Sequence, residues 1–303
     1  MAISRSQLVK ELEPGLNALF GLEYKRYENQ HAEIYATESS DRAFEEEVML
    51  SGFANAQVKG EGSGVSFDEA QETFTARYTH ETVALAFAIT EEAIEDNLYD
   101  RLASRYTKAL ARSMSNAKQV KSVEPLIQGL PTTDNFDSGD GVSLFNTAHP
   151  TVAGTFANTL ATQADLNETS LEQSLIDISS MTDERGLRIA ARGVKMIIPS
   201  ELQFTAERLM KSQGRTGTAD NDINAIVSMG MVPQGYRVNN YLTDSDAFYI
   251  LTDIPNGMKM FNRAPLTTAM EGDFDTGNVR YKARERYSFG VSDPRGIFGV
   301  EGA

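Results

Sequence analysis

The stretch TEEAIEDNLYDRLASRYTKALARSMSNAKQVKSVEPLIQG spans Thr90–Gly129 and decides the fold. Apolar or small side chains recur in it at steps of three and four, the spacing of one face of an α-helix. They are Ile94, Leu98, Leu102, Tyr106, Ala109, Ser113, Ala117 and Val120. At ~1.5 Å per residue this helix would be about 45 Å long, more than most helices of globular proteins. A coiled-coil-like helix in a bundle is one interpretation, and the flanking segments decide whether it holds.

The charges along this stretch follow the order that a helix dipole favours. Thr90 is the expected N-cap, and acidic residues follow it directly, whereas basic residues come later. The acidic residues are Glu91, Glu92, Glu95 and Asp96, and the basic ones are Arg105, Lys108, Arg112, Lys118 and Lys121. Pro125 is expected to end or kink the helix, because proline has no backbone N–H to donate.

The composition limits the classes of protein to which the chain can belong. Its 303 residues suffice for one large or two ordinary domains, and 41% of them are apolar. Cysteine is absent, so disulfides, thiolate metal sites and cysteine nucleophiles are excluded, and folding in the cytoplasm fits. The sequence has no apolar run that could span a membrane and no signal peptide. The net charge of −15 argues against wrapping nucleic acid, so neither specific nucleic-acid binding nor membrane association is expected.

The first 45 residues are predicted to form an extended arm. Leucines at positions 8, 12, 16 and 19 have helical spacing, but Pro14–Gly15 interrupts them, so only short helical pieces are expected. Such an arm buries little against itself. It is therefore either disordered or ordered by lying on another surface.

Residues 46–89 are predicted to form a long hairpin. Gly60–Gly64 holds three glycines and forms its tip, and Thr73–Ile89 is the returning strand. A two-stranded ribbon of this length has too little core to be stable alone in water. The support would come from a neighbouring molecule, or else the strands belong to an ordinary sheet of the same domain.

Residues 130–165 are rich in loop-forming residues. Asp134–Asp140 is acidic, but Phe136 occupies the third ligand position of a calcium loop and no glutamate closes it. A solvated loop is expected there.

Residues 166–275 are predicted to form a compact α/β unit. Two capping boxes, Thr169 with Glu172 and Ser200 with Gln203, would each open a helix. The inward stripes of the two helices are Leu171, Leu175, Ile178 and Met181, then Leu202, Ala206, Leu209 and Met210. A buried strand, residues 194–198, ends at Pro199.

Two loops of this unit also carry predictions. Gly214–Thr218 is too polar to pack and lacks the Gly-Lys-Ser/Thr of a phosphate-binding loop, so nucleotide binding is unsupported. Pro255–Gly257 is a turn signal that predicts a hairpin between the strands Phe248–Leu251 and Met258–Phe261.

The segment Gly277–Val291 has the clearest strand pattern of the chain. Its odd positions are apolar except for Glu285, and its even positions form a ladder of four cations. The cations are Arg280, Lys282, Arg284 and Arg286. Like charges in a row repel, so the ladder either meets carboxylates or faces solvent.

The sequence offers no pattern for catalysis. His31, His80 and His149 lie in three different segments without metal-ligand spacing, and neither a nucleophile elbow nor a dinucleotide fingerprint occurs. We therefore expect no enzyme, no catalytic or metal site and no cofactor.

The order of these segments resembles the major capsid proteins of tailed bacteriophages, with the Hong-Kong-97-like fold. Ser143–Pro150 (SLFNTAHP) and Tyr281–Phe298, which ends in SDPRGIF, are similar to the major head subunits of Mu-like phages. The resemblance implies an α+β fold with five parts. They are an N-terminal arm (1–45), an extended E-loop (46–89), a peripheral domain with its spine helix (90–150), an axial domain (151–275) and a return strand of the peripheral domain (276–303).

The resemblance also implies a function. Copies of the chain would assemble into pentamers and hexamers of an icosahedral shell around double-stranded DNA, in the host cytoplasm. The other partners would be a portal protein, a possible decoration protein and a separate scaffolding protein, since the chain lacks the long charged extension of members that carry their own scaffold. Lys59 lies near the hairpin tip, but no partner for a cross-link can be identified. Contacts between subunits are expected at Lys59, Glu61, Arg215, Arg280, Lys282, Arg284 and Arg286.

Two other functions remain open at this point. An encapsulin-like compartment shell of the same fold would enclose cargo and need no portal. A hydrolase with an acidic site would be a discrete monomer with activity toward a substrate.

Overall fold

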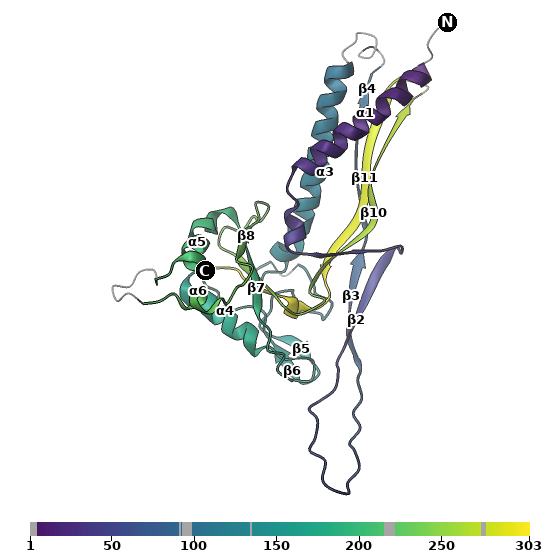
Figure 1. Cartoon of the computed structure of the whole chain (residues 1–303). Helices are drawn as coiled ribbons and strands as arrows, with labels where there is room; N and C mark the ends of the chain where they lie inside the picture. Colours follow the sequence, from purple (N-terminus) through teal and green to yellow (C-terminus); the bar gives the residue numbers. More distant parts are fainter. Residues whose placement is uncertain (1–4, 91, 93–98, 134, 215–221, 274–276) are drawn as a thin grey trace.

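A computed structural model describes residues 5–90, 92, 99–133, 135–214, 222–273 and 277–303. The molecule has an elongated unit of helices and long strands, a compact lobe, and a two-stranded loop that extends away from both (Figure 1). The expected mixed α+β architecture is thus observed. No helix of the described residues is both long and apolar enough to cross a membrane.

The helices and strands follow one another in a mixed order. The helices are α1 (Arg5–Arg26), α3 (Tyr99–Gln128), α4 (Glu168–Ser180), α5 (Gln203–Lys211) and α6 (Ala225–Met229), with 3-10 turns η1 (Gln30–Glu33), η2 (Ser200–Leu202) and η3 (Pro294–Gly296). The strands are β1 (Ala36–Ser39), β2 (Phe44–Leu50), β3 (Glu72–Thr79), β4 (Glu81–Ile89), β5 (His149–Thr151), β6 (Gly154–Phe156), β7 (Gly193–Ile198), β8 (Tyr236–Val238), β9 (Phe248–Thr252), β10 (Met258–Gly272), β11 (Val279–Val291) and β12 (Ile297–Val300).

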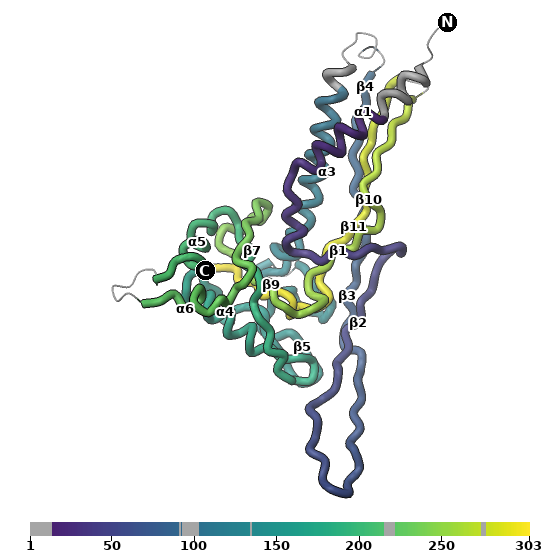
Figure 2. Tube along the Cα trace, viewed as in Figure 1, coloured from purple at the N-terminus to yellow at the C-terminus, as the bar shows by residue number. Residues whose placement is uncertain are grey.

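Two four-stranded sheets divide the described chain. The elongated sheet has the order β1-β10-β11-β4 and packs against α3 and α1. The compact sheet has the order β12-β9-β7-β8 and lies with α4, α5 and α6 in the lobe (Figure 1). Figure 2 shows how the chain leaves α1 and crosses as β1 to the base of the extended loop.

The long helix is present, but it buries a different face from the predicted one. Its buried apolar residues are Ala103, Leu110, Ala111, Met114, Val123 and Leu126. From the predicted stripe, Tyr106 remains 48% exposed and Val120 remains 42% exposed. The buried face was missed because it includes polar side chains such as Gln119, which gains partners inside the fold. The helix also continues past Pro125 to Gln128, whereas its predicted beginning, residues 91 and 93–98, lies outside the described residues.

The arm is more ordered than predicted. α1 runs through Pro14 as a continuous helix of 22 residues. Leu16 and Phe20 are buried against α3 and β11, and Phe20 lies 6.5 Å from the Tyr281 ring, centroid to centroid. Pro14 cannot donate one backbone hydrogen bond of the helix. The packing of this buried face stabilises the helix by more than that loss destabilises it. The prediction of an extended arm with short helical pieces was therefore wrong for residues 5–26.

The predicted hairpin strand is divided at His80 into two strands with different partners. β3 pairs with β2 to form the extended loop, and β4 pairs instead with β11 in the elongated sheet. The alternative of an ordinary sheet therefore holds for β4, whereas β2 and β3 form a separate two-stranded ribbon whose support by a neighbouring molecule stays a prediction. The glycine-rich tip forms a turn, in which the Ser63 N–H donates to the Gly60 carbonyl and Gly62 has a φ of +78°.

The helices of the compact lobe have the predicted inward faces but different caps. Leu171, Leu175 and Ile178 of α4 are buried. The capping box of α4 consists of Asn167 and Ser170, so the prediction of Thr169 with Glu172 was wrong by two residues. The predicted box at Ser200 is also absent, because η2 comes first and α5 begins without a side-chain cap.

The turn at Pro255–Gly257 exists, but it does not form a hairpin. β9 belongs to the compact sheet and β10 to the elongated one, so the turn carries the chain from one sheet to the other. Asn256 has a positive φ of 60° here, and a Cβ on Gly257 would lie 2.8 Å from Gly296 Cα.

The expected domain boundary at residue 275 falls between two strands that pair with each other, β10 and β11. The C-terminal strand β12, in contrast, pairs with β9 in the compact sheet.

Candidate assembly surfaces

The extended loop leaves many of its large apolar side chains exposed, because a two-stranded ribbon has no core of its own to bury them. Phe67 is 97% exposed and Phe53 is 62% exposed. The other exposed large apolar residues of the loop are Phe44, Val48, Leu50, Val58 and Val65. An apolar surface of this extent on a segment without its own core is typical of a protein–protein contact.

The base of the loop is fixed to the elongated sheet. Tyr78 is buried, its hydroxyl lies 2.5 Å from Ser292 Oγ, and its ring covers Gly290, where a Cβ would come within 2.6 Å of Tyr78 Cε1. Lys259 Nζ donates to Glu47 Oε1 at 2.6 Å and pairs with Glu38 at 3.2 Å. Burial lowers the pKa of Lys259, but the two carboxylates outweigh this and leave the pKa above its usual value. The loop is thus anchored at its base, while residues 52–70 are exposed.

The cation ladder of β11 lies on the exposed face, as the alternation predicted. Arg280 pairs with Asp273, and the Arg286 guanidinium donates to the carbonyls of His80 and Ala43. Among the described residues, no carboxylate lies within ion-pair distance of Lys282 or Arg284. These two cations are therefore available to another molecule.

The exception in the strand pattern, Glu285, points into the core. Its side chain is 2% exposed, and its Oε2 accepts from Lys118 Nζ at 3.2 Å and from the Tyr24 hydroxyl at 3.5 Å. Burial raises the pKa of Glu285, and the Lys118 ammonium opposes that rise. The exception in the pattern therefore reflects an ion pair that joins β11 to α3, with α1 as the third element.

The two stretches that carry the sequence resemblance meet at Asn158. Its amide nitrogen donates to the carbonyls of Leu144 (2.7 Å) and Pro294 (3.0 Å), and its Oδ1 accepts from the Asn146 N–H (2.9 Å). Asn158 Oδ1 also lies 3.0 Å from His149 Nε2. Because this side chain is fully buried and uses both ends of its amide, it fixes the position of both stretches.

His149 connects this asparagine to Asp140. Its Nδ1 lies 2.6 Å from Asp140 Oδ2, so both ring nitrogens face hydrogen-bond acceptors. Burial raises the pKa of Asp140, but hydrogen bonds from His149 and Ser138 outweigh this and place the pKa below its usual value. The prediction of a solvated loop was therefore wrong for Asp140, whose side chain is buried. No local pattern in the sequence indicates this pair, because eight loop residues lie between its members.

A second buried charge cluster lies beside this one. The Arg295 guanidinium pairs with Glu184 at 2.6 Å and with Asp293 at 3.2 Å, and it lies 4.1 Å from the Phe156 ring centroid. His149 stacks on Phe156 at 4.7 Å. Phe156 thus contacts the His149 ring of one network and the Arg295 guanidinium of the other. Only the Arg295 network joins the loop after α4 to the C-terminal segment, through Glu184 and Thr182.

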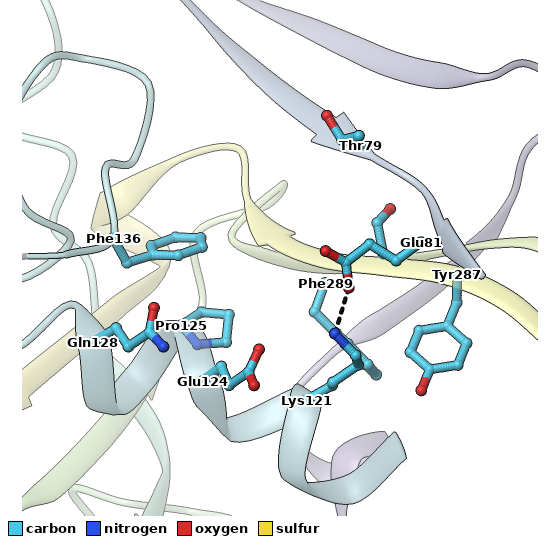
Figure 3. A pocket seen from close by; sticks show the side chains of 10 residues that line it. Thr79, Glu81, Lys121, Glu124, Pro125, Gln128, Phe136, Tyr287 and Phe289 are labelled. Carbon is cyan, nitrogen blue, oxygen red and sulfur yellow. Dashed lines mark hydrogen bonds and ion pairs between the residues drawn. The ribbon is translucent and has the colours of Figure 1, made fainter. Parts of the chain in front are cut away.

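A cavity of about 160 Å³ lies where α3 ends near the base of the loop (Figure 3). Glu81 and Lys121 form an ion pair in it, and Phe136 and Pro125 line the opposite side. The described part of the chain contains no group of three metal-ligating side chains. The exposed loop and the exposed cations of β11 are the surfaces that this structure offers for association.

The residues predicted to contact other subunits occupy two separate places. Lys59 and Glu61 lie at the exposed tip of the loop, whereas the four cations lie on β11 in the elongated unit (Figure 1). Arg215 lies outside the described residues, as do residues 216–218 of its loop. Sequence reasoning missed the exposed apolar residues of the loop as a set, although Phe53 and Phe67 on either side of a glycine-rich tip were visible as a signal.

Comparison with known families identifies the class to which this fold belongs. A family model described as phage capsid protein matches residues 72–300. The chain therefore belongs to the family of phage capsid proteins. Members of this family are structural proteins of the virion.

Solved structures support the same fold at low sequence identity. The chain is similar to a virus-like particle from Pyrococcus furiosus, with a TM-score of 0.54, 11% identity, and coverage of 95% of this chain and 98% of that one. The capsid of Myoviridae phage XM1 gives a TM-score of 0.51 with 13% identity and 89% of each chain covered. Microbacterium phage Oxtober96 gives a TM-score of 0.52 with 10% identity, covering 90% and 91%. A comparison with curated protein sequences gives no match.

Proposed function

We propose that copies of this chain interlock through the extended loop into pentamers and hexamers of a shell that encloses double-stranded DNA. The single observation that carries this proposal is the apolar surface of the loop, since seven large apolar side chains between Phe44 and Phe67 are exposed. In the free subunit these side chains face water, and burial against other copies would remove them from it.

Particular residues would make these contacts. The loop tip with Lys59 and Glu61 would lie on an adjacent subunit, and the uncommitted cations Lys282 and Arg284 would meet carboxylates there. Arg280, Arg286 and Arg215 would contribute further contacts. The elongated unit would serve as the peripheral domain and the compact lobe as the axial domain.

Other partners would act during assembly in the host cytoplasm. We propose a separate scaffolding protein and a portal protein, with a decoration protein on the outer surface as a further candidate. The subunit itself would have no catalytic role. Its net charge of −15 would keep the packaged DNA mobile against the inner wall, without sequence-specific binding.

The test replaces the two exposed phenylalanines of the loop with serine, in a Phe53→Ser/Phe67→Ser variant. Assembly is followed by sedimentation velocity and electron microscopy, and folding by circular dichroism. The expected result is a folded subunit that no longer forms particles, because the side chains to be buried are gone. The matched control is Phe204→Ser on α5, where an exposed phenylalanine outside the loop is removed. Particle formation by the loop variant at the unaltered level would overturn the proposal.

A compartment shell of the same fold that encloses protein cargo is the second candidate, because the exposed apolar loop could join its subunits equally well. Particles purified from the native source distinguish the two. Nuclease-protected double-stranded DNA supports the phage head, whereas an enclosed protein without DNA supports the compartment.

A further inference from the structure

The outer face of α3 carries an exposed helical stripe, which β4 meets at one edge, where the rings of Tyr106 and Phe87 lie 5.8 Å apart. Tyr106, Ala109, Ser113 and Val120 are exposed on this face, and they are the residues whose spacing led to the prediction of a buried stripe. The opposite face of the helix packs on β4, β11 and α1. Small and apolar residues at steps of three, four and seven along one helix face form a surface against which a second helix can pack.

Cations line one edge of this stripe. Arg105, Lys108 and Arg112 are exposed, and none of them has an ion-pair partner among the residues that the structure describes. Lys118 and Lys121 of the same helix, in contrast, pair with Glu285 and Glu81. Between residues 101 and 123 the helix contains no acidic residue, in a chain whose net charge is −15. The cations are therefore a local exception to the acidic character of the whole surface.

The position of the cations favours one class of partner. With 3.6 residues per turn, residues 105, 108 and 112 follow one line along the helix, beside the line of residues 106, 109, 113 and 120. A partner helix lying on this stripe would thus pack its central side chains against the small and apolar residues of α3. The side chains at its edge would lie next to the three cations. DNA would use the cations but gain nothing from the stripe beside them.

We propose that the outer face of α3, residues 105–120, is a docking site for an acidic amphipathic helix of a separate assembly protein. The role of that helix rests on the proposed shell function, whereas its binding does not, so the two can fail independently. The partner is defined by its chemistry: apolar residues on one face and Glu or Asp on the flank that meets Arg105, Lys108 and Arg112.

The probe is a labelled synthetic peptide of about 21 residues with Leu and Ala on one helical face and Glu on the others. Its binding to the full-length chain is measured by fluorescence anisotropy at two salt concentrations. Charge reversal of Arg105, Lys108 and Arg112 to Glu is expected to weaken binding by at least about tenfold. The neutral pair Lys108→Gln/Arg112→Gln is expected to weaken it less, and it serves if the triple variant fails to fold. Higher salt should also weaken binding, since the cations are exposed.

Two controls separate docking from charge attraction alone. Reversal of Arg188, Arg192 and Arg208, three exposed cations outside α3, changes the net charge equally and should leave binding within about twofold. Ala109→Trp fills the stripe without altering charge. It should weaken the binding of the peptide but not the binding of a DNA duplex of similar length.

Each remaining outcome overturns the docking proposal. Absence of peptide binding, equal binding of a scrambled peptide of the same composition, or equal binding by the α3 charge-reversal variant would each do so. Tighter binding of the duplex, unaffected by Ala109→Trp, would assign the face to nucleic acid instead. Particle formation, followed separately by sedimentation, tests the proposed shell function and does not enter this result.

Discussion

Lys118 Nζ lies 3.2 Å from Glu285 Oε2, and this ion pair is buried between α3 and β11. Glu285 Oε1 has no hydrogen-bond partner among the described residues, so Lys118 provides most of the compensation for the buried charge. The pair holds the long helix to the centre of the elongated sheet. Buried pairs of this kind stabilise little by themselves, but the loss of one partner leaves an expensive charge behind.

Lys118→Met should therefore lower the free energy of unfolding by about 3 kcal/mol at neutral pH, because Glu285 stays buried without its ammonium partner. The measurement is urea denaturation of the unassembled subunit. Burial raises the pKa of Glu285, so the loss should shrink as the pH falls and the carboxyl becomes protonated in the folded state. Lys118→Met/Glu285→Gln should be more stable than the single variant. A single variant with unchanged stability at neutral pH, or a gap between the single and double variants that does not narrow in acid, would contradict this account.

His31 should make the unfolding free energy depend on pH. It is buried beside Gln119 of α3, and burial together with the Lys118 charge lowers its pKa from about 6.5 to about 4. A lowered folded-state pKa contributes stability above the unfolded value of about 6.5, and this stability is lost as the pH falls toward 4. At about 1.4 kcal/mol per pKa unit, the loss over this range amounts to roughly 3 kcal/mol.

The test is a comparison of His31→Gln with the unaltered chain in urea at pH 7, 5.5 and 4.5. The variant cannot gain a proton at this position, so its unfolding free energy should fall less with decreasing pH. Parallel curves for the two proteins would show that His31 does not carry the dependence. His80→Gln is a useful comparison, because burial and Arg286 lower the pKa of His80 as well, at a separate place in the fold.

Asn158→Ala should be one of the most destabilising substitutions in the chain. It removes the donor to two buried carbonyls and the acceptor for the Asn146 N–H and for His149. Buried groups left unpaired cost about 1–3 kcal/mol each, so a loss of at least roughly 3 kcal/mol is expected. Thermal unfolding by calorimetry measures it, with Asn55→Ala in the exposed loop as the control. A loss no larger than that of the control would show that Asn158 does not organise the two stretches.

Gly290→Ala should disturb the base of the loop. The added Cβ would lie 2.6 Å from Tyr78 Cε1, and the ring is buried and bonded to Ser292, so it has little room to move. A loss of about 1–3 kcal/mol is expected, as for other overpacked sites. Gly21→Ala in α1 is the control, because nothing lies within 4 Å of its Cβ and a helix interior favours alanine. The prediction is wrong if both alanine variants unfold at the same temperature.

Local sequence patterns predicted the buried face of those elements whose apolar residues lie on one side only. The alternation along β11 placed Tyr281 and Ala283 inside and Lys282 outside, and the spacing of leucines in α4 predicted its inward face. The face of α3 could not be predicted this way. Both of its sides carry small and apolar residues, and the choice between them depends on Gln119 finding a partner in His31, far away in sequence.

Long-range pairing explains the remaining differences. The strand Thr73–Ile89 looks continuous, and only the separate partners of β3 and β4 reveal that His80 divides it. The charged networks around Asn158 and Arg295 are equally invisible in sequence, because their members come together only when the C-terminal segment returns to the lobe. The candidate loop, in contrast, could be predicted from its composition, since a ribbon without a core needs another surface.

The central claim is that residues 52–70 gain their burial from other copies of the chain. Hydrogen–deuterium exchange of this segment, compared between unassembled subunits and purified particles, tests it most directly. We expect rapid exchange in the subunit, where these residues are exposed, and strong protection in the particle. Equal, rapid exchange of this segment in both states would contradict the account, because the loop would then be unburied in the assembled shell.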